Sequence, residues 1–433
     1  MCDHPLPINA SRLFWLGAGV PLSLERVRRE AAGVARHLGS GVVVINLCRD
    51  RRFFMVGFLA AQMASCRTVL PPSLAPGILE SLQDSLEDCL VVDDARMEAW
   101  LGGSDAALQE GVPPWPGEDL DAVTLYTSGS TGQSIPHGRT WGQLCEGASM
   151  TLEALSGGIR APLNLVATVP SQHMFGLEST VMLPLLGMGC IHRGQPLFPE
   201  DVRKALISVP EPRGLITTPF HLRTCLSAIA DWPPLAFLLT ATAPMPADLA
   251  REAETRTGAC AFEIYGSTET GALAVREPAR HTRWRPLPGV ELLGPAAGGW
   301  RVKGRHFPSC VIHDELEPHE DGGFTLLGRQ GDLVKIAGKR QSMAAIGHLL
   351  LQAPGVSDAV AFPPGAGLSE DRVSALVVTE HALMPHLRAW LSRQLDAVFM
   401  PRPLIVVDRL PRDANGKLPR NEIERLLNTV RNR

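Results

Sequence analysis

The segment of this sequence best suited to chemistry is rich in glycine and hydroxyl side chains. It reads Thr127-Ser128-Gly129-Ser130-Thr131-Gly132, and it lacks the Gly-Lys-Ser/Thr ending of a Walker loop. Glycine lets the backbone approach an anion closely, and consecutive backbone N–H groups in such a turn form a concave anion site. The segment predicts a loop that binds the phosphates of a nucleotide. A plain surface loop of small polar residues is the alternative.

A second candidate segment ends an apolar run and reads Glu263-Ile264-Tyr265-Gly266-Ser267-Thr268-Glu269. Tyr265 is able to stack on a base, and Glu269 is able to coordinate a hard cation. Magnesium takes one or two carboxylates together with phosphate oxygens. A single glutamate beside a phosphate loop therefore fits a nucleotide–magnesium site. Taken alone, a carboxylate that only faces water at a strand end is the simpler explanation.

Two further segments lie toward the C-terminus. Residues 328–338 contain Arg329 and Gly331, and residues 411–417 contain an Asn-Gly pair followed by Lys417. An Asn-Gly pair marks a tight turn, which would expose the lysine. Taken alone, such a lysine is more often solvated surface than a catalytic group.

The elements that must position these segments alternate between helix and strand. Apolar residues at helical spacing predict helices over 23–38, 51–65 and 76–86. Short apolar runs predict strands over 42–47, 68–70, 90–92, 163–169, 215–218, 236–241 and 261–265. This alternation is typical of parallel sheets covered by helices, in which ligands bind beyond the carboxyl ends of the strands. After residue 329, helices over 343–352 and 381–395 with strands over 359–362, 375–378 and 404–407 predict a smaller α+β domain.

Composition excludes several classes of protein. The chain has 433 residues, 45% of them hydrophobic, which is enough for two or three domains. A net charge of -4 argues against a nucleic-acid partner. Nine scattered cysteines without a CxxC pair indicate no zinc site and no disulfide framework. With no signal peptide pattern and no apolar run long enough to span a membrane, we expect a cytoplasmic protein.

The four segments resemble, in order and spacing, those of the acyl-adenylate-forming superfamily of acyl- and aryl-CoA ligases, peptide-synthetase adenylation domains and luciferases. The family elements YTSGSTGxPKG, YGxTE, GRxxDxVKxxG and PxxxNGK match at residues 126–132, 265–269, 328–338 and 411–417. Weaker matches at 54–72 and 240–245 extend the resemblance over nearly the whole chain. It implies an α/β adenylate-forming fold. Residues 1–329 would form a large N-terminal domain of stacked sheets with covering helices, and residues 330–433 a smaller, mobile α+β domain.

The resemblance also implies ATP and Mg²⁺ as cofactors. Lys417 would bridge the carboxylate and the α-phosphate, Thr268 would contact the α-phosphate, and Glu269 would hold magnesium. Gly331 would be the hinge, and His173 would gate the acid pocket rather than serve only as a structural histidine. The further ATP-binding positions would be Thr127, Ser128, Gly129, Ser130, Thr131, Gly132, Thr242, Ala243, Pro244, Glu263, Ile264, Tyr265, Gly266, Ser267, Asp314 and Arg329. The acid pocket would be lined by His173, Phe175, Gly176, Leu177, Gly266, Gly271 and Leu273.

The chain departs from the family pattern in three places. Ile135 stands where the family has a lysine after the phosphate loop, and His137 or Arg139 would have to supply positive charge. The ribose-binding Asp314 follows Ile-His instead of Thr-Gly, and Gly331 replaces the hinge Asp or Lys. The N-terminal part is also short for the family.

These assignments predict a ligase that forms an acyl-AMP from a carboxylic acid and ATP, and then passes the acyl group to a thiol. The compact length and the Pro136-His137 variant resemble short ligases of aryl-polyene and xanthomonadin-type pigment clusters. That resemblance favours an aryl acid such as a hydroxybenzoate, with the phosphopantetheine thiol of an acyl carrier protein as acceptor. Free CoA stays open as the acceptor. An AMP-binding regulatory protein without catalysis, which Ile135 favours, and a luciferase-like oxidase also stay open.

Overall fold

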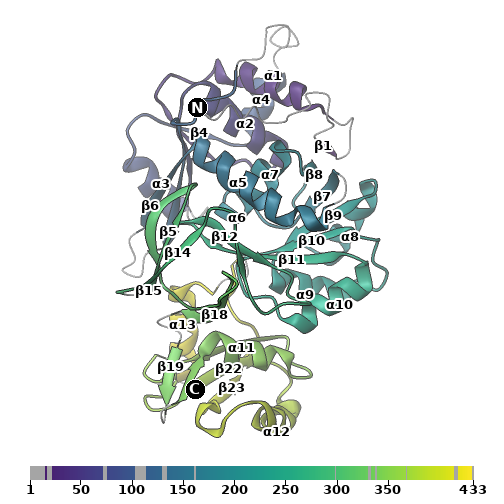
Figure 1. The fold of residues 1–433 in the computed structure, drawn as a ribbon, viewed down its shortest axis with the longest axis vertical. Coiled ribbons are helices and arrows are strands. Elements are labelled where there is room, and N and C mark those ends of the chain that lie inside the picture. The colour runs from purple at the N-terminus through teal and green to yellow at the C-terminus, as the bar shows by residue number, and fades with distance from the viewer. Residues whose placement is uncertain are drawn as a thin grey trace. The chain divides into compact units, whose positions relative to one another are not determined.

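The computed structural model describes residues 15–16, 22–71, 76–102, 114–128, 134–159, 162–297, 299–329, 333–336, 339–366, 368–413 and 418–431. The chain divides into two compact units (Figure 1). The first comprises residues 1–291 and 303–310, and the second comprises residues 292–302 and 311–433. The domain boundary between residues 329 and 330 and the hinge at Gly331 stay predictions.

The larger sheet of the first unit has the order β1-β8-β7-β9-β10-β11-β12-β13. Its strands are β1 (Trp15–Leu16), β7 (Leu163–Ala167), β8 (Gly189–His192), β9 (Arg213–Thr217), β10 (Phe237–Thr240), β11 (Cys260–Ser267), β12 (Gly271–Arg276) and β13 (Arg285–Pro286). The strands from β1 to β11 are parallel, and β12 and β13 are antiparallel. Helices α8 (Pro199–Ser208), α9 (Pro219–Ala228) and α10 (Ala247–Thr257) cover one face, where they pack on alternate strand residues such as Leu215 and Leu238.

The other face of this sheet shares a core with a second sheet. That sheet has the order β4-β2-β3-β5-β6. Its strands are β2 (Val43–Asn46), β3 (Thr68–Leu70), β4 (Cys89–Val92), β5 (Asp121–Ser128) and β6 (Ser134–Thr140). The core between the sheets contains α1 (Leu24–Ala35), α2 (Arg51–Met63), α4 (Asp94–Gly102) and α5 (Trp141–Leu155). Leu82 of α3 (Pro76–Asp84) packs on Ile45 and Val69 at the outer face.

The predicted α/β fold with stacked sheets and covering helices is therefore confirmed. The predicted helices and strands of the first unit lie within a few residues of those observed. The sequence did not predict that β5 and β6 form a hairpin around the expected phosphate loop. No helix in the described part of the chain is long and apolar enough to cross a membrane.

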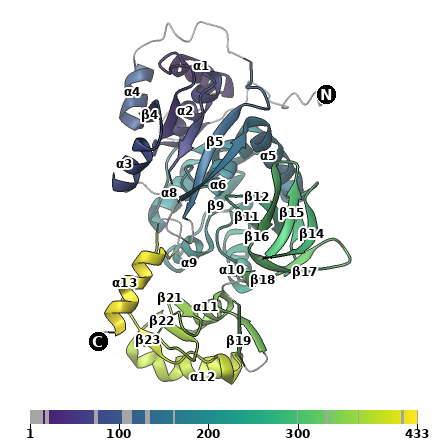
Figure 2. The ribbon, with the colours of Figure 1, turned by 90° about the vertical axis from the view of Figure 1, so that its left-hand side faces the viewer.

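The strands after residue 290 are short and mostly antiparallel. One sheet is formed by β14 (Glu291–Ala296), β15 (Gly299–Gly304) and β16 (Phe307–Ile312), and one hairpin by β17 (Asp314–Pro318) and β18 (Phe324–Arg329). The second unit continues with the hairpin β19 (Leu333–Ile336) and β20 (Lys339–Ser342) and the sheet β21 (Asp358–Phe362), β22 (Ser374–Val378) and β23 (Leu404–Val406). Its helices are α11 (Met343–Gln352), α12 (Met384–Gln394) and α13 (Arg420–Arg431) (Figure 2). The smaller α+β arrangement expected after residue 329 is confirmed.

Two of the charged side chains buried in the first unit are Arg51 and Glu178. Arg51, at the start of α2, is 2% exposed and donates hydrogen bonds to the carbonyl oxygens of Ala167 (2.9 Å), Val169 (2.5 Å) and Gly194. It thereby ties α2 to the loops that follow β7 and β8. A buried cation is tolerated here because several carbonyl oxygens replace its water.

Glu178 is the second buried charge and begins a π-helical turn, η3 (Glu178–Met182), that directly follows α6 (Met174–Leu177). The side chain is 7% exposed, and its Oε1 accepts a hydrogen bond from the backbone N–H of Ala272 at 3.3 Å. This bond joins η3 to β12. Burial raises the pKa of the Glu178 carboxyl to about 7, because an ionised carboxylate loses its hydration there.

Replacing Glu178 with glutamine should remove a pH-dependent part of the stability. The folded chain holds the proton of Glu178 up to about pH 7, whereas the ordinary pKa is 4.5. The contribution of Glu178 to the free energy of unfolding is fully present below its pKa in the unfolded chain. This contribution is lost as the pH rises through its pKa in the folded chain, by up to roughly 3 kcal/mol. Urea unfolding of the wild type and of Glu178→Gln between pH 4.5 and 8 measures the difference.

The control is Glu153→Gln, which changes an exposed carboxylate on α5 and should leave the pH profile of the wild type unchanged. Equal pH dependence in the wild type and in Glu178→Gln would show that Glu178 does not titrate in this range.

Candidate functional site

The turn between β11 and β12 carries two of the predicted site residues, Thr268 and Glu269. The turn is closed by the Thr270 hydroxyl, which accepts a hydrogen bond from the backbone N–H of Ser267 at 3.1 Å. Thr268 and Glu269 lie at its tip, and the Glu269 side chain is 43% exposed. Because β11 belongs to the parallel part of the sheet, the turn lies beyond a carboxyl end, where ligands bind in such sheets.

Two side chains of β6 hold this turn from the neighbouring sheet. Arg139 is 5% exposed, and its guanidinium donates to the backbone carbonyl oxygens of Thr268 (3.1 Å) and Glu269. His137 Nε2 lies 3.8 Å from Oε1 of Glu269. Burial lowers the pKa of His137, which favours the neutral ring. The sequence proposed either residue as a substitute for the missing lysine; in the structure, Arg139 supports the turn of Glu269.

A second turn follows β10. Thr242 has a φ of +78°, an uncommon conformation for a β-branched residue, and such strain is concentrated at functional sites. The turn is supported by Glu263, whose Oε1 accepts from the backbone N–H of Met245 (2.8 Å) and whose Oε2 accepts from Nε of Arg276 (2.7 Å). The exposed residues of the turn are Thr242, Ala243 and Pro244.

The strand β11 places the remaining residues that were predicted to surround the nucleotide. Ile264 is buried, and the half-buried ring of Tyr265 lies 5.5 Å from that of Trp284. A bulge between Tyr265 and Gly266 changes the pairing with β12. Such bulges redirect side chains beside active sites.

The predicted phosphate loop connects β5 and β6. Thr127 pairs with Ile135, and Ser128 pairs with Ser134. Gly129, Ser130, Thr131 and Gly132 lie outside the described residues, as do Gly331 and Lys417. The strands on both sides show that the loop is the end of a hairpin, whose β6 arm carries His137 and Arg139 to the turn of Glu269.

The residues predicted to form the acid pocket lie on α6, β11 and β12. His173 precedes α6 as its half-buried N-cap residue, Phe175 is half-buried, and Leu177 and Leu273 are buried. The pocket glycines are required by close backbone contacts. A Cβ on Gly176 would lie 1.8 Å from the carbonyl oxygen of Pro170, and one on Gly266 would lie 2.1 Å from that of Gly271.

The two predicted ribose contacts belong to the second unit and face each other. Asp314 and Arg329 are direct partners in the β17–β18 ladder. The Asp321-Gly322 pair lies in the turn between β17 and β18, where Asp321 Oδ1 accepts from the N–H of Gly323 at 3.0 Å and Gly322 has a φ of +81°.

Sequence reasoning missed two buried residues beside the pocket, Glu178 and His306. His306 is 2% exposed, and its Nε2–H donates to the carbonyl oxygen of Ala272 at 2.8 Å. Glu178 was detectable in principle, because it directly follows Gly176-Leu177 and is the one charged residue between His173 and His192. His306 is distant in sequence and carried no comparable signal.

Glu269 fits a magnesium site in which phosphate oxygens of the nucleotide supply further ligands of the ion. Among the described residues, no three His, Cys, Asp or Glu side chains lie close enough to hold a metal by themselves. A half-exposed carboxylate such as Glu269, next to a phosphate loop, matches the preference of Mg²⁺ for few carboxylates and several other oxygens.

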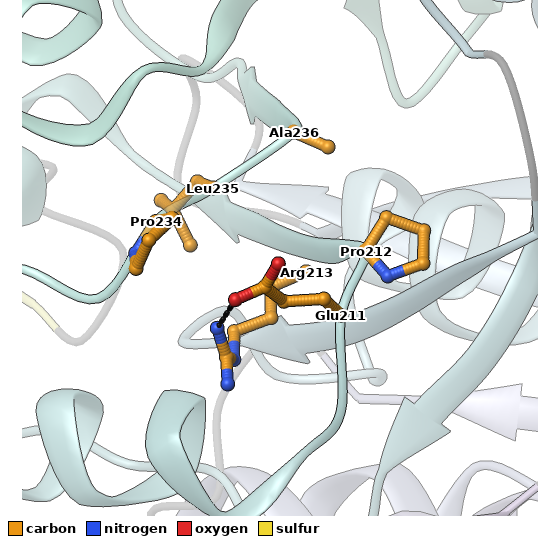
Figure 3. A pocket seen from close by; sticks show the side chains of 6 residues that line it. All are labelled: Glu211, Pro212, Arg213, Pro234, Leu235 and Ala236. Atoms are coloured by element: carbon orange, nitrogen blue, oxygen red, sulfur yellow. Dashed lines mark hydrogen bonds and ion pairs between the residues drawn. The ribbon is translucent and has the colours of Figure 1, made fainter.

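A hollow elsewhere in the first unit is unrelated to this site. It is lined by Glu211, Pro212, Arg213, Pro234, Leu235 and Ala236, with an ion pair of 2.9 Å between Glu211 and Arg213 (Figure 3). These residues precede or begin β9 and β10, so the hollow lies at the amino ends of the strands. The two turns lie at the opposite ends.

Known proteins resemble this chain in sequence. The 4-coumarate–CoA ligase of Cereibacter sphaeroides is 34% identical over 180 residues, which cover 42% of this chain and 42% of the relative. The match thus spans less than half of that relative. The 4-coumarate–CoA ligase of Halorhodospira halophila is 27% identical over 316 residues, which cover 70% of this chain and 76% of the relative.

Solved structures share the fold over nearly the whole chain. The anthranilate CoA ligase AuaEII with anthranoyl-AMP gives a TM-score of 0.82 at 16% identity and covers 98% of this chain and 96% of that chain. The O-succinylbenzoate CoA synthetase of Bacillus subtilis with ATP and a magnesium ion gives 0.78 at 19% identity and covers 96% and 97%. The profile of the AMP-binding enzyme family matches residues 18–296. The chain therefore belongs to the AMP-binding enzyme family, the acyl-adenylate-forming ligases that its motifs indicate.

Proposed function

We propose that this protein is a magnesium-dependent ligase that activates an aryl acid as its acyl-AMP and transfers the acyl group to CoA. The observation that carries the proposal is the pair of fixed turns beyond the adjacent parallel strands β10 and β11. One turn exposes Thr242 in a strained conformation, and the other presents Glu269. Each is held by a buried charged side chain, Glu263 and Arg139 respectively.

In the first half-reaction, an oxygen of the substrate carboxylate attacks the α-phosphorus of ATP, and pyrophosphate leaves. The exposed turn of Thr242 receives the adenine, the β5–β6 hairpin receives the phosphates, and Thr268 contacts the α-phosphate. Glu269 holds Mg²⁺, which offsets phosphate charge. Lys417 stabilises the charge that develops between carboxylate and phosphate. In the second half-reaction, the thiol attacks the acyl carbon and AMP leaves.

CoA is the better-supported acceptor. Both sequence relatives described above are named as CoA ligases. The carrier protein expected from sequence depends on the pigment-cluster resemblance, and basic residues of the second unit would have to meet its acidic surface. Arg388 and Arg393 are five residues apart on α12, about 140° around the helix, so these two arginines do not share one face of it. Arg425 on α13 pairs with Glu422 at 2.8 Å.

An aryl acid is favoured by the relatives and by the apolar residues of the pocket. Both relatives are named for 4-coumarate, an aryl acid. Phe175, Leu177 and Leu273 supply apolar surface at the predicted pocket.

Replacing Lys417 with alanine should abolish most adenylation, by on the order of a hundred-fold or more, because one positioned charge at the reacting phosphate is removed. ATP–pyrophosphate exchange with a panel of aryl and fatty acids measures the effect and also tests the proposed function. Lys204→Ala, an exposed lysine of α8, is the control and should match the wild type. Exchange within a few-fold of the wild type would remove Lys417 from the mechanism, and an absence of exchange with every acid would favour the regulatory alternative.

Replacing Glu269 with glutamine should raise the magnesium concentration that gives half-maximal exchange, because a neutral amide is a weaker ligand for a hard cation. The measurement is exchange as a function of Mg²⁺ at fixed ATP and acid. Glu252→Gln, on the exposed face of α10, should keep the wild-type dependence. An unchanged magnesium dependence of Glu269→Gln would reduce Glu269 to a surface residue.

With the preferred acid, thioester formation should be faster with free CoA than with a phosphopantetheinylated carrier protein at the same concentration. The two acceptors share the reactive thiol and differ only in what is attached to it. Thioester yield over time with each acceptor, at low and high salt, decides between them. Faster, salt-sensitive transfer to the carrier would restore the carrier protein as acceptor, since docking of charged surfaces weakens as salt screens it.

A further inference from the structure

The backbone of Gly271 and Ala272 at the start of β12 is enclosed by two buried ionisable side chains. Glu178 accepts a hydrogen bond from the N–H of Ala272 at 3.3 Å, and His306 donates one to its carbonyl oxygen at 2.8 Å. A Cβ on Gly271 would lie 2.5 Å from Oε1 of Glu178 and 3.7 Å from Cδ2 of His306. Only a glycine lets both side chains approach the strand this closely.

Each of these side chains has one polar atom without a hydrogen-bond partner among the described residues. Within the described part of the chain, the bond from Ala272 is the one hydrogen bond to Glu178 and goes to Oε1, so Oε2 has no donor. Nδ1 of His306 is also buried without a partner among those residues. Because Nε2 carries the proton that Ala272 accepts, Nδ1 is a lone-pair acceptor. Burial lowers the pKa of His306 to about 4, which keeps the ring neutral.

The nearest buried cation does not neutralise Glu178. Arg139 contributes favourable charge, but it donates its hydrogen bonds to the carbonyl oxygens of Gly138, Thr268 and Glu269. A buried acceptor without a donor costs about 1–3 kcal/mol, and more when it is charged. Glutamine would satisfy the N–H of Ala272 without an ionisable group. Above about pH 7 the ionised carboxyl therefore costs stability that a glutamine would not cost.

The position of Glu178 indicates that its unpartnered oxygen lies at the predicted acid pocket. The residue directly follows Gly176 and Leu177 and contacts Gly271, and these three were predicted from sequence to line the acid pocket. It also begins η3, and π-helical turns occur frequently at functional sites. Its bond to Ala272 joins the two sides of the predicted pocket, α6–η3 and β12.

We propose that Glu178 selects the acid substrate by accepting a hydrogen bond from a donor on its organic part, so that the preferred substrates are acids that carry a hydroxyl or amino group. This inference rests on the proposed function, because it assigns the residue to the acid pocket of that enzyme. Nδ1 of His306 is an acceptor, and Oε2 of Glu178 is an acceptor when the carboxyl is ionised, so a donor group on a ligand would pair with either atom. A site built to bond a hydroxyl group discriminates strongly against the analogue that lacks it, because its own polar atoms then stay unpaired.

The experiment compares matched acids in the wild type, Glu178→Gln, Glu178→Leu and the control Glu153→Gln. Each pair keeps the shape and differs in the donor: 4-hydroxybenzoate with 4-fluorobenzoate, 4-coumarate with cinnamate, and 3-hydroxybutyrate with butyrate. The readouts are kcat/KM for ATP–pyrophosphate exchange and the Kd of each acid from calorimetry. Glu178→Gln keeps an oxygen for the N–H of Ala272, so it separates recognition from folding.

In the wild type, at least one donor acid should be preferred over its partner by about ten-fold or more, in exchange and in Kd. Glu178→Leu should reduce that preference to within a few-fold by weakening the donor acid alone, with Glu178→Gln intermediate. An equal loss for both members of each pair, or an unchanged preference, would overturn the inference. If no acid supports exchange but the Kd preference depends on Glu178, the proposed function fails and the inference stands. If exchange occurs without any donor preference, the inference fails and the function stands.

Discussion

The guanidinium of Arg139 makes the contact on which the proposed site depends. It leaves β6 of the smaller sheet and bonds to the carbonyl oxygens of Thr268 and Glu269 on the larger one. A single buried cation thus couples the hairpin of the predicted phosphate loop to the turn of the predicted magnesium ligand. The carbonyl oxygens replace the water that the guanidinium loses, and its delocalised charge makes arginine suited to this position.

The same arrangement recurs around the carboxyl edge of the larger sheet. Arg51 holds the loops after β7 and β8, Glu263 holds the turn after β10, and Glu178 holds the start of β12. Loops alone would be mobile at this edge. Buried charged side chains can bond several backbone groups at once, and they fix the loops without filling the space that a ligand needs.

Glu178 differs from the others in the balance of its bonds. Arg51 has three carbonyl partners, and Glu263 has both an N–H and an arginine. Glu178 has one weak donor and a neighbouring acceptor, His306. An incomplete set of bonds in a protein interior is costly, and such costs are usually retained where a ligand completes them. Arg51 and Glu263 are therefore interpreted as structural side chains, and Glu178 as a side chain that binds the substrate.

The sequence by itself determined several helices and most parallel strands of the first unit, the smaller α+β arrangement after residue 329, the family and the segments that carry chemistry. Those features depend on local periodicity and on contiguous motifs such as residues 265–269, which are visible along the chain. Only the tertiary structure decided the roles of Arg139, Glu178 and His306. Arg139 contacts Thr268 and Glu269, which are separated from it by 129 and 130 positions in the sequence. His306 contacts Ala272, and these two are separated by 34 positions. The reason is physical: a hydrogen bond depends on position in space and on burial, and neither is encoded at short range in the sequence.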